Sequence, residues 1–187
     1  RVTGRLRYSD EACTASQEPR PGRKLRVLVI GEHSAGFWNA MDPFVEALVG
    51  GEGFDVDVRR HPADRDPGGF PASMSLTAAL QDSDIVIGNG SSALLEAIYW
   101  YRPVIICAVS ELGDRAGYVR DGLAMECDKP EDLAETCQRI FASDRHDKIQ
   151  TAHDMVWGGT QVEAAPEILA AGAASGSSEG PSEAEVI

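Results

Sequence analysis

Two short motifs place imidazole, hydroxyl and carboxylate side chains where predicted strands end. The first is Arg59-Arg60-His61-Pro62, and the second, Gly88–Ala97, reads GNGSSALLEA. In the second motif two glycines and two serines open a helix, whose free backbone N–H groups and neighbouring hydroxyls suit a phosphate group. Glu96 follows one turn further in, where its carboxylate suits the hydroxyls of a ribose. Together the motifs predict a site for a nucleotide diphosphate.

The elements that must position these motifs alternate between strand and helix. Runs rich in β-branched residues predict strands at 24–30, 54–60, 84–88 and 103–109. Helical spacing of apolar residues predicts helices at 39–49, 76–81, 91–101, 130–141, 145–157 and 161–170, with Asn39 as the N-cap of the first. This alternation predicts an α/β fold, a three-layer Rossmann-like arrangement in which helices cover both faces of a parallel sheet.

Four polar loops follow the predicted strands, at 31–34, 61–62, 88–92 and 110–118. Ligands of such sheets bind beyond the carboxyl ends of the strands, so these loops share one rim. Glu96 is the candidate ribose ligand, and Asp114 with Arg115 belongs to a candidate closing loop. The candidate diphosphate ligands are Gly31, Ser34, His61, Asn89, Gly90, Ser91 and Ser92.

Each candidate also has a purely structural interpretation. His61 before a proline suits a surface loop, Ser91-Ser92 suits an N-cap pair, and Asp114-Arg115 suits ordinary loop charges. The aromatic run 99–101 is better explained by packing than by base stacking. Both interpretations stay open for the polar residues, and the convergence of four loops favours the site.

Composition narrows the class of protein. The chain has 187 residues, 43% of them hydrophobic, which suffices for about one domain. Its formal net charge of -13 argues against a nucleic-acid partner. None of the four cysteines forms a C-x-x-C pair, so no metal site is expected, and Cys107 in an apolar strand suits a buried small hydrophobe. No apolar run reaches the length of a membrane-spanning helix.

Changes in composition along the chain suggest three segments. Residues 1–22 are polar and form a linker or interdomain segment, residues 23–170 form the Rossmann-like domain with the predicted nucleotide site, and residues 171–187 form a disordered acidic tail. Because the chain begins with Arg1, we expect a processed product or a piece of a longer protein.

Several of these residues resemble known families. Val2-Thr3-Gly4 with Arg7-Tyr8 resembles the segment that enters the second domain of GT-B glycosyltransferases and of non-hydrolysing sugar-nucleotide 2-epimerases. Arg60-His61-Pro62 resembles the R-x-H-P motif of the CDP-glycerol glycerophosphotransferase and polysialyltransferase-like group. Residues 80–103 (LQDSDIVIGNGSSALLEAIYWYRP) are similar to the Ser-Ser-Glu block of that group.

This resemblance implies the C-terminal, donor-binding half of a two-domain transferase that works in surface polysaccharide or cell-wall polymer synthesis. Its partner would be a sugar or alditol activated by CDP or UDP, bound as substrate without a cofactor. A missing N-terminal half would carry the acceptor site and the catalytic base, so the isolated chain is expected to be inactive. The resemblance further implies a cytoplasmic protein, held at the inner face of the membrane through that missing half. Within this chain the sequence identifies no catalytic residue. His61 is a candidate, and Asp114 and Glu111 are the nearest candidates for a base.

Two alternatives remain. A 2-epimerase half has a similar fold and a similar Ser-x-x-x-Glu element, although residues 110–115 (SELGDR) lack the Arg- and Glu-rich loop of that family. The second alternative is a non-catalytic nucleotide-binding or interaction domain. A phospho-receiver domain is disfavoured, because Gly31-Glu32 and Gly88-Asn89 do not supply its acidic residues.

Overall fold

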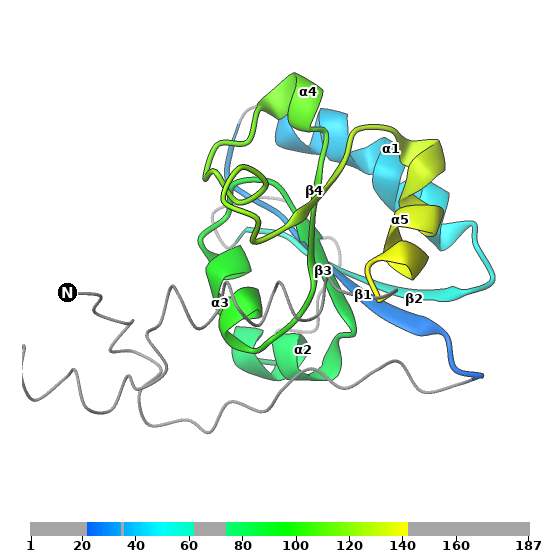
Figure 1. Ribbon diagram of the computed structural model, residues 1–187. Helices are drawn as coiled ribbons and strands as arrows, with labels where there is room; N and C mark the ends of the chain where they lie inside the picture. The colour runs from blue at the N-terminus through cyan, green and yellow to red at the C-terminus, as the bar shows by residue number, and fades with distance from the viewer. Residues whose placement is uncertain (1–21, 35, 62–73, 142–187) are drawn as a thin grey trace, which may run out of the picture. The chain divides into compact units, whose positions relative to one another are not determined.

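The fold is a five-stranded parallel sheet in the order β2-β1-β3-β4-β5 (Figure 1). The computed structural model describes residues 22–34, 36–61 and 74–141. The strands are β1 (Leu25–Ile30), β2 (Phe54–Arg59), β3 (Ile85–Gly88), β4 (Val104–Cys107) and β5 (Met125–Cys127). Every neighbouring pair runs parallel.

Helices cover both faces of this sheet. They are α1 (Phe37–Val49), α2 (Leu76–Asp82), α3 (Ala93–Tyr99), α4 (Val109–Leu112), the 3-10 helix η2 (Pro130–Asp132) and α5 (Leu133–Arg139). Helices α1 and α5 pack together on one face, and α2 and α3 pack together on the other (Figure 1). The predicted three-layer, Rossmann-like α/β fold is therefore confirmed.

Burial on both faces explains the continuous apolar character of the central strands. Residues that alternate along each strand contribute to opposite layers. Val29 and Ile87 pack with Phe37 and Met41 of α1 in the first layer. On the other face α3 contacts β3 and β4, and its Leu94 and Ile98 are fully buried.

The start of α1 differs from the prediction. Asn39 is exposed inside the helix, and the N-cap is Gly36, which makes no side-chain cap hydrogen bond. Gly36 has φ 80°, a left-handed conformation that glycine adopts without a steric penalty. The cap thus lies three residues before Asn39, and the assignment of Asn39 as the cap was wrong.

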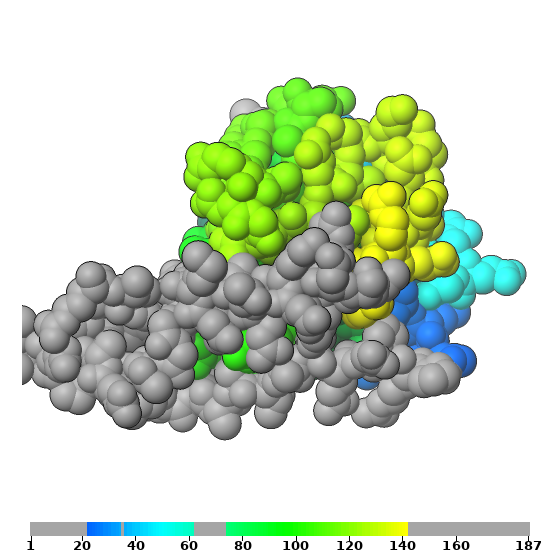
Figure 2. Space-filling model, viewed as in Figure 1, coloured from blue at the N-terminus to red at the C-terminus, as the bar shows by residue number. Residues whose placement is uncertain are grey.

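The region after β4 also differs from the prediction. Strand 103–109 was expected, but β4 ends at Cys107 because Ala108 has φ 56° and turns the chain into α4. The predicted polar loop 110–118 thus begins inside a helical turn. Strand β5 was not predicted at all, because three residues give too little alternation to detect. Residues 113–124, between α4 and β5, form a broad part of the surface that is visible in Figure 2.

The other predicted elements are present with ends shifted by one to three residues. The expected helices at 145–157 and 161–170, and the segments 1–21 and 171–187, lie outside the described residues. Among the helices of residues 22–34, 36–61 and 74–141, none combines the length and the apolar character needed to cross a membrane.

The amino ends of β1 and β3 are joined through a buried carboxylate. Asp84, 8% exposed, accepts hydrogen bonds from the guanidinium of Arg23 at 2.7 and 2.8 Å. It also accepts one from the backbone N–H of Arg26 at 2.8 Å. This cluster fixes the sheet at the end opposite to the predicted rim.

Candidate functional site

The strand order creates a crevice between the carboxyl ends of β1 and β3. The chain passes from β1 to β2 on one side and then returns to β3 on the other, so the loops after β1 and β3 diverge. Open α/β sheets bind ligands at such a switch point. The loop that begins with Gly31 and the loop that begins with Asn89 flank this crevice.

The carboxylate of Glu32 connects three loops of this rim. Its Oε1 accepts hydrogen bonds from the hydroxyl of Ser34 at 2.7 Å and from the guanidinium of Arg115 at 2.9 Å. Its Oε2 accepts one from the backbone N–H of Gly90 at 3.1 Å. The loops after β1, β3 and β4 therefore meet at one side chain, and predicted residues Ser34, Gly90 and Arg115 are brought together.

Arg60 and His61, directly after β2, join the same rim through aromatic contacts. The rings of His33 and His61 stack with their centroids 5.5 Å apart. The guanidinium of Arg60 lies 4.4 Å from the ring centroid of Trp38, a cation–π contact. A Cβ at Gly31 would lie 2.4 Å from Trp38, so glycine is required there for packing. Both sequence motifs thus reach a single edge of the sheet.

Within the β3–α3 loop, Asn89 has a structural partner. Its side chain is fully buried, and its Nδ2 donates to the carbonyl of Cys107 at 3.0 Å, which ties this loop to the end of β4. Its Oδ1 is buried and has no hydrogen-bond partner in the described part of the chain. Contact between Asn89 and a diphosphate stays a prediction.

The two serines of this loop differ in their surroundings. Ser91 Oγ accepts from the backbone N–H of Ala93 at 3.3 Å, and the Ser91 carbonyl accepts from the hydroxyl of Tyr118 at 3.2 Å. Ser92, the N-cap of α3, is exposed and makes no side-chain cap hydrogen bond. The N-cap-pair interpretation therefore fits Ser91 better than Ser92, which is an exposed residue of the rim.

Glu96 lies in α3 and is only 4% exposed. A buried carboxylate is costly unless it is hydrogen-bonded, so this position is not the solvated helix face of an ordinary surface glutamate. Its assignment to a ribose stays a prediction. Tyr99 and Trp100 are buried, as the packing interpretation of the aromatic run requires.

The candidate closing loop is folded onto the rim. Arg115 donates to Glu32 and, through Nε, to the carbonyl of Leu112 at 3.1 Å. Asp114 accepts through Oδ2 from the backbone N–H of Arg120 at 3.0 Å, which orders the turn after it. The sequence predicts Arg115 as a residue of this rim, but it does not identify Glu32 or Tyr118 as contacts within it. A charged residue at the second position after the strand, next to Gly31, was the available signal for Glu32.

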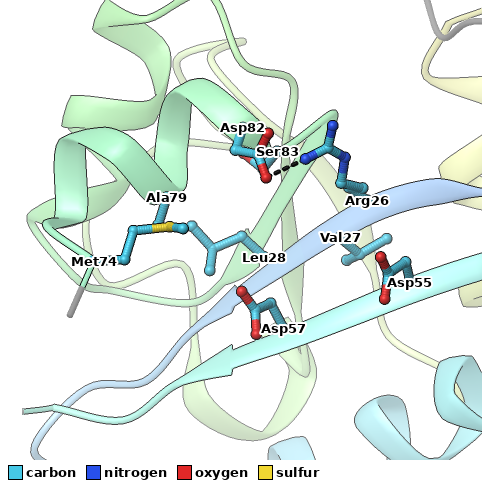
Figure 3. A pocket seen from close by; sticks show the side chains of 9 residues that line it. All are labelled: Arg26, Val27, Leu28, Asp55, Asp57, Met74, Ala79, Asp82 and Ser83. Atoms are coloured by element: carbon cyan, nitrogen blue, oxygen red, sulfur yellow. Dashed lines mark ion pairs between the residues drawn. The ribbon is translucent and has the colours of Figure 1, made fainter. Parts of the chain in front are cut away.

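A cavity of about 210 Å³ lies elsewhere, beside β1, β2 and α2 (Figure 3). Asp55 and Asp57 of β2 point toward it, and Arg26 forms an ion pair with Asp82 at its border. It shares no residue with the rim, and its carboxylates disfavour a phosphate. We therefore assign the candidate site to the rim rather than to this cavity.

Three cysteines gather beneath the carboxyl ends of β4 and β5. Cys107 and Cys127 are register partners on these strands, and Cys137 of α5 is buried with them. A hydrogen bond from the Cys107 thiol, assisted by the Thr136 hydroxyl, lowers the pKa of Cys127 from 9.0 to about 7. Burial raises the pKa of Cys107 and raises that of Cys137 to about 12. The expected burial of Cys107 is confirmed.

No group of three or more His, Cys, Asp or Glu side chains within residues 22–34, 36–61 and 74–141 is arranged to hold a metal ion. The rim instead offers hydroxyls, a backbone N–H, a guanidinium and imidazoles around the carboxylate of Glu32. These groups suit an anion.

Comparisons with known proteins give structural relatives only. No family model matches the chain, and no curated protein sequence matches it. Among solved structures, the chain is similar to the glycosyltransferase SnogD from Streptomyces nogalater, with TM-score 0.57, 18% identity and coverage of 82% of this chain and 45% of that one.

Two further structures show the same likeness. A protein described as a UDP-N-acetylglucosamine 2-epimerase, from Listeria monocytogenes, has TM-score 0.55 and 15% identity over 97% of this chain and 54% of its own. The wall teichoic acid polymerase TagF has TM-score 0.52 and 15% identity over 85% and 45%. The chain thus spans about half the length of these proteins. It has the Rossmann-like α/β fold found in GT-B glycosyltransferases.

Proposed function

We propose that this chain is the donor-nucleotide-binding half of a glycosyl- or glycerophospho-transferase. The observation that carries the proposal is the meeting of residues from four strand ends beside the β1/β3 crevice. Hydrogen-bond donors from three of these loops converge on the carboxylate of Glu32. In a chain of net charge -13, such a local group of donors is what an anionic ligand requires.

The proposed division of roles follows the positions of the residues. Ser34, Gly90, Ser92 and Arg115 would hold the diphosphate, and His61 would neutralise charge that develops on it as the leaving group departs. Glu96 would bind the ribose. The resemblance to the CDP-glycerol group favours a role in surface polysaccharide or cell-wall polymer synthesis, with a CDP- or UDP-activated sugar or alditol as donor and no cofactor.

Titration of the chain with CDP and UDP tests the binding step directly. We expect weak, saturable binding by calorimetry, with NMR shifts confined to residues 31–34, 61, 89–96 and 114–118. Cytidine and uridine serve as controls that lack the diphosphate. A folded sample that shows no shift with millimolar nucleotide would contradict the proposal.

The transferase step needs a second test, because the chain covers about half of its structural relatives. In a GT-B architecture the reacting groups meet between two domains, and positioning supplies much of the rate. We expect no product from CDP-glycerol or a sugar nucleotide with these 187 residues alone, and turnover once the proposed N-terminal half is restored. Turnover by the isolated chain would refute the proposed division of labour. The peripheral association with the inner face of the membrane would likewise reside in that half.

A 2-epimerase half is the second candidate, favoured by the likeness to the Listeria protein across 97% of this chain. It predicts selective binding of UDP-N-acetylglucosamine. Competition between this ligand and CDP-glycerol in the same titration separates the two candidates.

A further inference from the structure

We infer that the carboxylate of Glu32 is an internal anion that occupies a phosphate seat, and that a bound diphosphate must displace it. The phosphate seat is defined by three donors: the Ser34 hydroxyl, the Gly90 backbone N–H and the Arg115 guanidinium. The identity of the phosphate as that of a nucleotide rests on the proposed function. The existence of the seat rests only on the contacts of Glu32.

The donors of the phosphate seat come from three separate loops and converge on both carboxylate oxygens. The distances to Ser34, Arg115 and Gly90 are 2.7, 2.9 and 3.1 Å. A hydroxyl, a guanidinium and a backbone N–H are the donors that proteins use for phosphate oxygens. A surface ion pair between two side chains would need neither the glycine N–H nor the hydroxyl.

Gly90 shows how closely the anion approaches the backbone. A Cβ at this position would lie 2.9 Å from Glu32 Oε2 and 3.2 Å from the Cβ of Arg115. The bare Cα therefore leaves the space in which the anion reaches the N–H. The methyl group of an alanine would therefore intrude on the space that the anion occupies.

Burial and exposure differ between the two charged partners. The side chain of Glu32 is 12% exposed, whereas that of Arg115 is 44% exposed. The carboxylate is thus largely shielded from solvent, and its interactions are screened less by salt than those of a surface pair. Of the two charged partners, Arg115 is the one that solvent reaches more readily.

Two anions cannot share these three donors, because their repulsion opposes the hydrogen bonds that each would make. When the site is empty, Glu32 holds Arg115 and the β3–α3 loop in place. When a phosphate arrives, Glu32 must leave. Displacement therefore lowers the affinity for any anion that makes no further contacts, and it favours a ligand that also contacts the rest of the rim.

Removal of the charge of Glu32 tests this inference. The probes are inorganic pyrophosphate and CDP, titrated into the full chain by calorimetry. We expect Glu32→Gln to raise the affinity for pyrophosphate by about tenfold, the scale of a charge-assisted hydrogen bond. The matched control is Glu52→Gln, which removes the same charge from an exposed turn before β2, at the opposite end of the strands. It should change the affinity by less than about twofold.

Two further variants keep the test decisive. In the Glu32→Gln background, Gly90→Ala or Arg115→Gln should abolish the gain, because each removes part of the phosphate seat. Glu32→Asp keeps the charge but shortens the side chain, so it should give a smaller gain with the fold retained. An NMR spectrum of each variant checks the fold.

The outcomes separate this inference from the proposed function. If CDP binds to the wild-type chain at the rim but Glu32→Gln and Glu32→Asp leave both affinities unchanged or lower them, Glu32 is a structural tether and the inference fails while the proposed function stands. If pyrophosphate binding rises in Glu32→Gln while no nucleotide binds at the rim, the phosphate seat stands and the proposed function fails. If neither probe binds to any variant, both fail.

Discussion

His33 and His61 stack with their ring centroids 5.5 Å apart and their planes inclined by 29°, although they follow different strands. This contact joins the end of β2 to the loop after β1, which flanks the crevice between β1 and β3. It also places His61 of the first sequence motif beside the neighbour of Glu32, which in turn binds Gly90 of the second motif.

Replacement of His61 by alanine should weaken the binding of CDP or UDP more than that of the bare nucleoside. The imidazole is assigned to the diphosphate, and loss of one such hydrogen-bond partner costs about 1–3 kcal/mol. Calorimetric titration of each variant with nucleotide and nucleoside measures the difference. Equal losses for both ligands would point instead to a general disturbance of the stack with His33.

Ser92 and Glu96 should separate the two halves of the ligand. Ser92→Ala removes a hydroxyl that makes no cap hydrogen bond, so we expect weaker diphosphate binding with little change in stability.

Glu96→Ala should weaken the binding of both nucleotide and nucleoside, because its carboxylate is assigned to the ribose. Glu96→Gln preserves the packing of this buried position and serves as its control. Indistinguishable ligand profiles for Ser92→Ala and Glu96→Ala would overturn these assignments.

Asp84 should matter for stability and not for binding. Asp84→Asn weakens the contacts with Arg23 and the Arg26 N–H, so we expect the free energy of unfolding to fall by about 1–3 kcal/mol. Asp82→Asn is the matched control, because its ion pair with Arg26 is exposed and contributes less than about 1 kcal/mol. Urea denaturation compares the two. A normal unfolding midpoint for Asp84→Asn would show that this cluster does not fix the sheet.

Cys127 should titrate near neutral pH. Its pKa is lowered to about 7 from 9.0, so its contribution to folding stability is lost as the pH falls through 7 and grows as the pH rises toward 9. The Cβ chemical shift of Cys127 should therefore show a midpoint near pH 7. Cys107→Ala removes the hydrogen bond that causes the shift and should move the midpoint upward.

Cys137→Ala is the control for this titration, because Cys137 contributes no hydrogen bond to Cys127. An unchanged midpoint in Cys107→Ala would mean that the thiol of Cys107 is not the cause. The thiol of Cys137 itself should stay protonated through this range, since burial raises its pKa to about 12.

The sequence predicts the layered fold well because its central strands are buried on both faces. Every residue of Ile85–Gly88 and Val104–Cys107 is buried. Such continuous apolar runs indicate strands that are covered by helices on both faces. Backbone conformation is harder to predict. The left-handed turns at Gly36 and Ala108 end or begin elements where side-chain patterns give no sign, and β5 has too few residues for a pattern.

The same limit applies to the candidate site. Positions at strand ends follow from the order of elements, so Ser34, His61, Gly90 and Arg115 could be named in advance. The central role of Glu32 depends on long-range contacts with Gly90 and Arg115. Nothing in the spacing of these three residues encodes such a meeting, which arises only when the loops fold together.

The indole of Trp38 gives this protein a built-in optical reporter. Trp38 lies against Gly31 on one side and carries the guanidinium of Arg60 over its ring, so it lies at the rim itself. Trp100, in contrast, is 3% exposed beside Tyr99. A ligand that draws Arg60 away should change the charge over the Trp38 ring, so the part of the fluorescence emission that comes from Trp38 should report occupancy of the rim without any label.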